Sequence, residues 1–327
     1  METNLNKQVN ITPLLQKAAL GNGNVAITET PGMYTYKTKV EDNWAYYTAE
    51  GFKILKKILE HEKKPAGNFA IVGIGSGVEG ILALKVFAGG LDNLVVSDID
   101  NEILKGAQAN ILSTAKQYQT TFLPLVGSFT EPMQALPFKF NVIYGNIPNL
   151  PSKVGQDLKF GDEKGTFLPI DTFQKYGPPP EFAKWAMAAQ YAYLQSAKKV
   201  LKAGGSILTE LGGRMPLETV QKLFDTCGFK MDEILVGFKE QTEPLMDFAG
   251  YHEFENRYGV KFDFYKYEES KKLMEEKGIT NPTNLISGEN LKKLLAPFKV
   301  NAGQALELFK QGIAVGHTVH IFRGIYE

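Results

Sequence analysis

The sequence predicts an α/β protein with a doubly wound, mainly parallel sheet, and three observations support this prediction. First, short apolar runs alternate with helix-like segments through the middle of the chain. Second, the apolar run at 69–73 leads into three alternating glycines, Gly73, Gly75 and Gly77. Third, the next apolar run ends in an acid, Asp98. Open α/β sheets bind ligands at the carboxyl ends of their strands, so the glycines and the acid indicate a ligand site at that edge.

The remaining elements follow in order along the chain. A helix at 49–63 has Phe52, Leu55, Ile58 and Leu59 at helical spacing and should dock on the sheet. The predicted strands are 69–73, 94–97, 122–126, 140–144, 205–211 and 231–238, with a last strand at 314–325. The predicted helices between them are 78–88, 101–112 and 181–201. We therefore expect an N-terminal helical segment (1–65), a core (66–242 and 313–327) and a helical, aromatic-rich insertion (243–312) before the last strand.

The glycine loop alone leaves two kinds of cofactor open. Gly75, Gly77 and Gly80 also fit the G-x-G-x-x-G pattern of dinucleotide sites. An acid at the position of Asp98 suits the two hydroxyls of a ribose, which nicotinamide dinucleotides and S-adenosylmethionine both contain. Asp98 or Asp100 could instead cap the helix that follows, because aspartate is a favoured N-cap residue.

The end of the fourth predicted strand is more discriminating. The strand at 140–144 leads into the tetrapeptide Asn146-Ile147-Pro148-Asn149. With the glycine loop and Asp98, this ending resembles class I S-adenosylmethionine-dependent methyltransferases. It is similar to the Asn-Pro-Pro-Tyr motif of amino-group and amide methyltransferases, including the release-factor glutamine methylases. Methyltransferases of this class end with an antiparallel strand beside the fifth, a place that the segment at 314–325 suits.

The resemblance implies S-adenosyl-L-methionine as the cofactor. It implies that the cofactor-binding residues are Gly73, Gly75, Gly77, Asp98, Ile99 and Asn146. The chain departs from the family pattern at three positions. Ile71 stands where the family often has an acid, and Ile147 and Asn149 replace the first proline and the aromatic residue.

A second stretch narrows the resemblance. Residues 207–230, ILTELGGRMPLETVQKLFDTCGFK, resemble the methyltransferase region of methionine S-methyltransferases, and the match as a whole covers roughly 69–264. This resemblance implies a small amino-acid-like acceptor, with the sulfur of L-methionine first among the candidates. Arg214 could grip the acceptor carboxylate with its planar fork, or it could be a solvated surface arginine. Glu210 could meet an ammonium group or face solvent.

The expected catalytic residues are Asn146, Ile147 and Arg214. Asn146 and the backbone carbonyl of Ile147 would orient a nitrogen acceptor by accepting its hydrogens, whereas a thioether loses no proton. Two other acceptors stay open, a protein glutamine and a small amine. Two other classes of protein also stay open, a nicotinamide-dependent oxidoreductase and an inactive cofactor-binding scaffold. Aromatic residues of the insertion, of which we expect one or two to face the ligand, could stabilise a cationic product.

Composition limits the partners and the compartment. The chain has 36 basic and 36 acidic residues, so nothing in its net charge favours nucleic acid or an anionic membrane. The basic cluster Lys198, Lys199 and Lys202 is expected at a helix end, where cations suit the dipole. The single cysteine, Cys227, suits a reducing compartment, and the polar start and the lack of a long apolar run predict a cytoplasmic protein.

We expect no metal, because His317 and His320 would point to opposite faces of a strand. The oligomeric state is not indicated.

Overall fold

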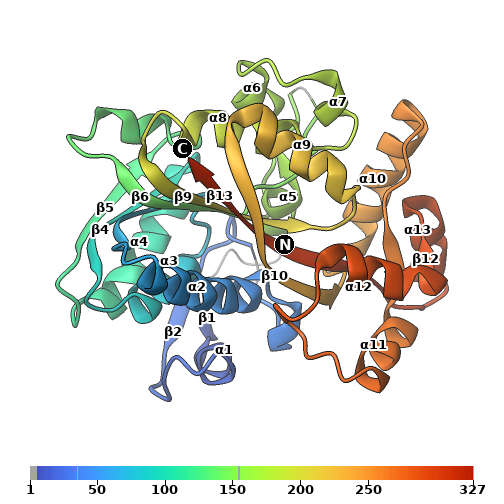
Figure 1. Ribbon diagram of the computed structural model, residues 1–327, viewed down its shortest axis with the longest axis horizontal. Helices are drawn as coiled ribbons and strands as arrows, with labels where there is room; N and C mark the ends of the chain where they lie inside the picture. The colour runs from blue at the N-terminus through green and yellow to red at the C-terminus, as the bar shows by residue number, and fades with distance from the viewer. Residues whose placement is uncertain (1–5, 35, 154, 327) are drawn as a thin grey trace.

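The main sheet has the doubly wound order that the sequence predicts (Figure 1). The computed structural model describes residues 6–34, 36–153 and 155–326. Its seven long strands are β3 (Gly67–Val72), β4 (Leu91–Asp98), β5 (Thr121–Val126), β6 (Phe140–Gly145), β9 (Leu201–Gly212), β10 (Phe229–Glu240) and β13 (Val315–Tyr326). They lie in the order β5-β4-β3-β6-β9-β13-β10. The strands from β5 to β9 are parallel, and β13 runs antiparallel to both β9 and β10. The predicted fold class, including the antiparallel last strand beside the fifth, is therefore confirmed.

Two short strands from the insertion extend this sheet. β11 (Phe264–Lys266) pairs with the first residues of β13, and β12 (Lys299–Val300) pairs with β11. The sheet formed by the described residues therefore has nine strands, the seven predicted ones and these two. They were not visible in the sequence because each is only two or three residues long.

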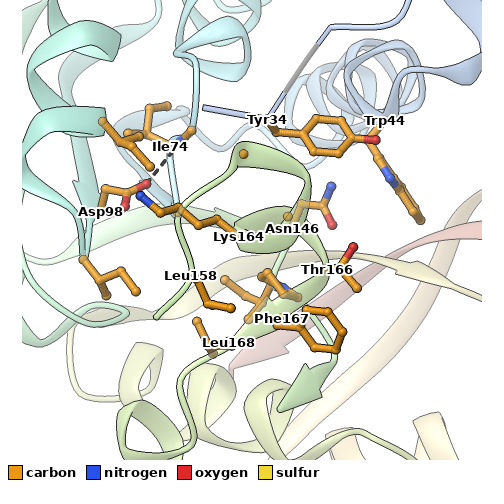
Figure 2. Close-up of a pocket in the computed structure, with 18 of the residues that line it drawn as sticks. Tyr34, Trp44, Ile74, Asp98, Asn146, Leu158, Lys164, Thr166, Phe167 and Leu168 are labelled. Carbon is orange, nitrogen blue, oxygen red and sulfur yellow. Dashed lines mark hydrogen bonds between the residues drawn. The ribbon is translucent and has the colours of Figure 1, made fainter. Parts of the chain in front are cut away.

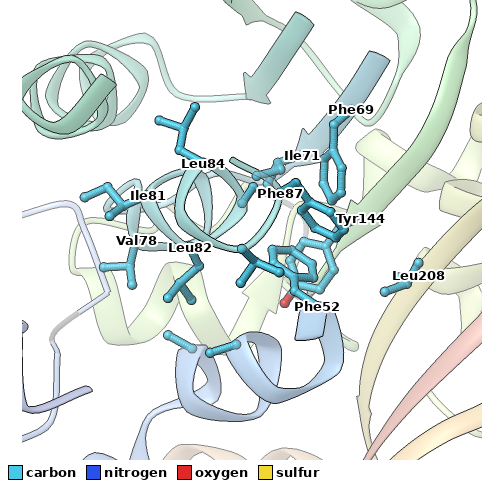
Figure 3. Packing of buried hydrophobic residues seen from close by; sticks show 14 of the residues in the cluster. Phe52, Phe69, Ile71, Val78, Ile81, Leu82, Leu84, Phe87, Tyr144 and Leu208 are labelled. Carbon is cyan, nitrogen blue, oxygen red and sulfur yellow. The ribbon is translucent and has the colours of Figure 1, made fainter. Parts of the chain in front are cut away.

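Helices cover both faces of the sheet. On one face lie α2 (Trp44–His61), α3 (Val78–Val86) and α4 (Asn101–Ala115), and on the other lie α8 (Ala188–Ala197) and α9 (Leu217–Cys227). Successive residues of β3 alternate between the two cores, because side chains along a strand point to opposite faces. Figure 3 shows the core under α2 and α3, where the ring of Phe52 lies 5.4 Å from Phe69 and 5.0 Å from Tyr144. Ile71 is buried in this core.

The N-terminal segment is less helical than predicted. It contains a two-stranded sheet, β1 (Lys7–Asn10) with β2 (Ala26–Glu29), the short helix α1 (Thr12–Lys17) and the turn η1 (Val40–Asp42). The side-chain amide of Asn110 on α4 bonds the backbone of Thr28, with distances of 2.8 and 3.0 Å, and so attaches this small sheet to the core. The helix predicted at 49–63 begins earlier, at Trp44, and this extension brings its first turn to the ligand edge.

The segment between β6 and α8 is folded. It contains β7 (Leu150–Pro151), α5 (Gly161–Thr166), β8 (Phe167–Leu168), α6 (Ile170–Gln174) and α7 (Pro180–Ala183), while η2 (Glu131–Ala135) precedes β6. The prediction of a single helix at 181–201 is wrong, because α7, α8 and the start of β9 occupy this range. The chain breaks after α7, where Ala186 has a φ of 56°, and β9 starts at Leu201. Lys202 therefore lies on a strand, and the predicted basic helix end is wrong for that residue.

Most secondary structure between residues 243 and 312 is helical. This insertion contains α10 (Pro244–Tyr258), α11 (Tyr267–Glu276), α12 (Gly288–Leu295), η3 (Ala296–Phe298) and α13 (Ala302–Lys310), gathered at one end of the sheet (Figure 1). Most of its aromatic side chains pack against one another, among them Phe248, Phe262 and Phe264. Whether this region is a separate domain stays a prediction. No helix in the described ranges combines the length and the apolar character needed to cross a membrane.

Candidate active site

A large cavity lies at the carboxyl ends of the parallel strands. Its volume is about 760 Å³, which is within the range for a cofactor pocket. The loops after β3, β4, β6 and β9 line it, and so do the start of α2, the segment around α5, and α10 of the insertion. All but one of the predicted site residues line this cavity: Gly73, Gly75, Asp98, Ile99, Asn146, Ile147 and Arg214.

The exception is Gly77, which lies behind the loop. Its φ is 87°, and an added Cβ would come within 2.9 Å of the Ala107 carbonyl on α4. Gly75 also has a positive φ, 54°, but an added Cβ there would meet no described atom within 4 Å. Gly73 and Gly75 thus present open backbone to the cavity, whereas Gly77 lets α3 and α4 approach each other. The two kinds of glycine serve different purposes in one motif.

Asp98 closes the cavity beside the glycine loop. Its Oδ2 accepts from the Gly75 amide at 3.2 Å and its Oδ1 accepts from the Asp100 amide at 3.0 Å. Burial raises the pKa of this carboxyl. The N-cap of α4 is Asp100, whose Oδ1 accepts from the amides of Glu102 and Ile103. Of the two roles that the sequence left open, helix capping therefore belongs to Asp100. Ile99 is 44% exposed and forms an apolar wall of the cavity.

The end of β6 is held by a residue that sequence reasoning missed. Gln190 of α8 is buried, and its amide donates to the Ile147 carbonyl at 3.0 Å and to Asn149 Oδ1 at 3.1 Å. Its own carbonyl accepts from Thr209 Oγ1 of β9. Asn146 is half-buried, and in Figure 2 it lies between Asp98 on one side and Trp44 on the other. Gln190 thus positions the strand end on which Asn146 stands.

Two segments far apart in the sequence cover the cavity together. An added Cβ at Gly161 would overlap the Met33 carbonyl, and one at Gly165 would overlap the ring of Tyr34. Lys164 of α5 forms an ion pair with Asp100 at 2.7 Å, next to Asp98 (Figure 2). Met33 and Tyr34 therefore pack against α5 and form one cover with it, closed on the side of Asp98 by an ion pair.

Arg214 is buried rather than solvated. It follows the end of β9, and its Nη2 donates to Gln241 Oε1 at 2.7 Å. Its guanidinium carbon lies 5.0 Å from the centre of the Tyr251 ring. Among the described residues, no carboxylate oxygen lies within 4.0 Å of the guanidinium, and its Nε has no hydrogen-bond partner. The nearest acid in this network is Asp247, which accepts from Gln241, and burial raises its pKa to about 6.

The two histidines on β13 are structural. His317 stacks on Trp44 at 5.4 Å, on the face of α2, while His320 stacks on Phe322 and bonds Glu233 at 2.6 Å. They point to opposite faces of the strand, as predicted. Over the ranges that the structure describes, no three His, Cys, Asp or Glu side chains gather as a metal-binding group.

Comparison with known proteins gives a likeness of fold only. No family model and no curated protein sequence matches the chain. A protein from Pyrococcus horikoshii described as an RNA methyltransferase candidate matches with 11% identity over 96% of each chain and a TM-score of 0.43. A precorrin-6y C5,15-methyltransferase from Geobacter metallireducens matches with 10% identity over 90% of this chain and 94% of its own, with a TM-score of 0.40. A phosphoethanolamine N-methyltransferase from Haemonchus contortus, solved with S-adenosylhomocysteine, gives 13% identity over 84% of this chain and 52% of its own, with a TM-score of 0.36. At these values the function has to be inferred from the cavity itself.

Proposed function

We propose that the protein is an S-adenosylmethionine-dependent methyltransferase acting on a small amino-acid-like acceptor. One observation supports this most. The glycine loop, Asp98 and Asn146 line one cavity, and Arg214, a buried cation with no carboxylate partner among the described residues, lines the same cavity. A nicotinamide enzyme would need neither the Asn146 strand end nor this arginine.

The residues beside the loop fit the proposed cofactor. The open backbone at Gly75 allows close approach of a ligand, and Asp98 keeps lone pairs for ribose hydroxyls after accepting two backbone amides. Bound S-adenosylmethionine would supply an electrophilic methyl group on a sulfonium. The tasks of the protein are then to align the acceptor and to exclude water. The cover formed by Tyr34 and α5 suits the exclusion of water, because residues of both segments line the cavity.

The acceptor we favour is a free amino acid, with L-methionine first. The burial of Arg214 supports a carboxylate ligand, because an unpaired buried guanidinium is costly and a bidentate carboxylate would compensate it. Tyr251 is the one insertion aromatic that we expect to meet the ligand, since it lines the cavity beside Arg214. Methylation of a protein glutamine or a small amine is the second candidate. The expectation that nucleic acid is no partner stays a prediction.

The first experiment separates the classes. Calorimetry should show binding of S-adenosylmethionine and S-adenosylhomocysteine and no binding of NAD, and the reverse result would end the proposal. A screen of free amino acids with labelled donor and mass spectrometry then identifies the methylated atom. With the acceptor found, Arg214→Lys should raise its KM about 10- to 100-fold, because an ammonium cannot make the two-pronged contact. An unchanged KM would remove Arg214 from the acceptor site.

A further inference from the structure

Glu210 is a buried acid with one oxygen left free. It lies on β9, is 1% exposed and lines the cavity. Its Oε2 accepts from Thr48 Oγ1 of α2 at 2.7 Å and from the Tyr144 hydroxyl of β6 at 2.6 Å. Its Oε1 is buried and has no hydrogen-bond partner among the described residues. A buried carboxylate held by one oxygen leaves strong acceptor capacity unused at the other.

The strand register places Glu210 at the carboxyl ends of β6 and β9, where the cavity lies. β6 and β9 are parallel, with Gly145 level with Thr209, so Glu210 is one step further on, level with Asn146. Because alternate residues share a face, Glu210 lies on the same face as Tyr144 and α2. Four residues later in the chain, Arg214 lines the same cavity. An acidic side chain and a cationic side chain therefore line the same cavity.

Among the described residues, no cationic side chain lies within 4.0 Å of the Glu210 carboxyl. Burial raises the pKa of its carboxyl to about 8, and the neighbouring carboxyl of Glu79 on α3 adds to this effect. Burial raises the pKa of Glu79 itself to about 7. Lys239 of β10 opposes the shift, but its ammonium donates to the backbone carbonyl of Glu240 and to Thr242 Oγ1 instead. Tyr144 completes the titratable groups, and burial holds its pKa well above the ordinary value. A cationic ligand beside Glu210 would offset the cost of holding its ionised carboxylate in a buried position.

We propose that Glu210 is the subsite for a primary ammonium group of a ligand in this cavity. The proposal rests on the methyltransferase function proposed above and deepens it. Two ligands of that function carry such a group: the cofactor, through its amino-acid tail, and an amino-acid acceptor. A primary ammonium fits because it offers three hydrogens to Glu210 Oε1 and to neighbouring acceptors such as the Asn146 carbonyl oxygen or side chain. With Arg214 taking the carboxylate, the cavity would recognise an α-amino-acid zwitterion by both its charges.

The experiment compares ligands with and without the ammonium. Calorimetry at pH 7 uses S-adenosylhomocysteine and its desamino analogue, and then L-methionine and 4-(methylthio)butanoate with S-adenosylhomocysteine present. The proteins are the wild type, Glu210→Gln, and the control Glu218→Gln, which removes an exposed acid on α9. Glu210→Gln should weaken the ammonium-bearing member of one pair about 10- to 100-fold and leave its desamino partner unchanged. The pair affected identifies the source of the ammonium.

A second readout is specific to the carboxyl. An ammonium that binds Glu210 lowers its pKa, so binding at pH 7 should release up to about one proton per site, and Glu210→Gln should abolish this release. Calorimetry in buffers of different ionisation enthalpy measures it. Tyr144→Phe, which removes one hydrogen bond to Oε2, should give a smaller selective loss and carries the test if Glu210→Gln does not fold.

The two proposals fail in different ways. Suppose that the wild type binds S-adenosylhomocysteine, but that Glu210→Gln either weakens amino and desamino ligands equally or weakens neither. The ammonium subsite is then refuted and the methyltransferase proposal stands. If the wild type binds neither S-adenosylhomocysteine nor L-methionine, both proposals fall.

Discussion

The Glu210→Gln variant should change how stability depends on pH, even without a ligand. Glu210 titrates near pH 4.5 when unfolded, and burial raises its pKa to about 8 in the folded protein. Between these values the folded state holds a proton that the unfolded state has lost, so the free energy of unfolding falls as pH rises. The full stability is present below pH 4.5, and the loss ends above pH 8.

The magnitude follows from the width of this window. Each pH unit between the two pKa values costs 1.36 kcal/mol, but at pH 5 and at pH 8 one of the two states is only partly ionised. Glu210 should therefore remove about 3 kcal/mol of stability between pH 5 and pH 8. Glutamine does not titrate, and its amide occupies nearly the same volume. The variant should therefore gain about 3 kcal/mol on the wild type over this range. Glu79, Lys239 and Asp247 also titrate near neutrality, but both proteins contain them.

Urea unfolding at pH 5, 6, 7 and 8 measures this difference as a change in the transition midpoint. Glu218→Gln, which removes an exposed acid on α9, should follow the wild type at every pH. Parallel midpoints for Glu210→Gln and the wild type from pH 5 to pH 8 would refute the assignment of Glu210 as a buried acid without a cation.

Three further substitutions test the cavity. Asp98→Ala should weaken S-adenosylhomocysteine by about 1.5–3 kcal/mol in calorimetry, because a charge-assisted contact to the ligand is lost, while Asp92→Ala on the exposed end of the same strand should bind normally. Equal affinity of the two variants would exclude Asp98 from the cofactor site. Asn146→Ala should lower kcat far more than cofactor affinity if Asn146 orients the acceptor, as the sequence predicts. Equal losses in steady-state rates and binding would make it part of the cofactor site instead. Gly75→Val should abolish cofactor binding with a modest loss of thermal stability, whereas Gly80→Val should lower the Tm strongly, because its Cβ would overlap Ile111 of α4. Similar Tm values for the two glycine variants would contradict their separate roles.

Local sequence patterns predicted well which residues line the cavity at the strand ends. The glycine loop, Asp98 and the end of β6 each follow a buried strand directly, so a single periodicity argument places all three. Parallel strands then bring their carboxyl ends to one edge without further information. For this reason most predicted cofactor residues line the cavity, and only Gly77, which packs against α4, does not.

The rest of the cavity could not be predicted in the same way. Trp44 and Tyr34 line the site from a helix start and a connecting segment, and Gln190 holds the end of β6 from the first turn of α8. Nothing in their sequence neighbours signals a ligand. The hydrogen bonds that hold the buried carboxyl of Glu210 come from Thr48 and Tyr144, which lie 162 and 66 residues away in the chain. Burial of a polar side chain is a tertiary property. A single sequence carries a signal for it only where the residues form a local motif, as at Gly212-Gly213-Arg214.

The position of β13 has a consequence for how this chain folds. β13 fills the gap between β9 and β10, yet 75 positions separate Glu240 at the end of β10 from Val315 at its own start. Until β13 docks, β10 has no strand partner in the described sheet, and β9 exposes an edge of unpaired backbone groups. The parallel half, from β5 to β9, can assemble from nearby segments, whereas closing the other half requires contacts that are distant in sequence and slow to form. A partly folded chain would thus carry an unpaired sheet edge next to the unfinished cavity, so conditions that delay docking of β13 favour aggregation through β9.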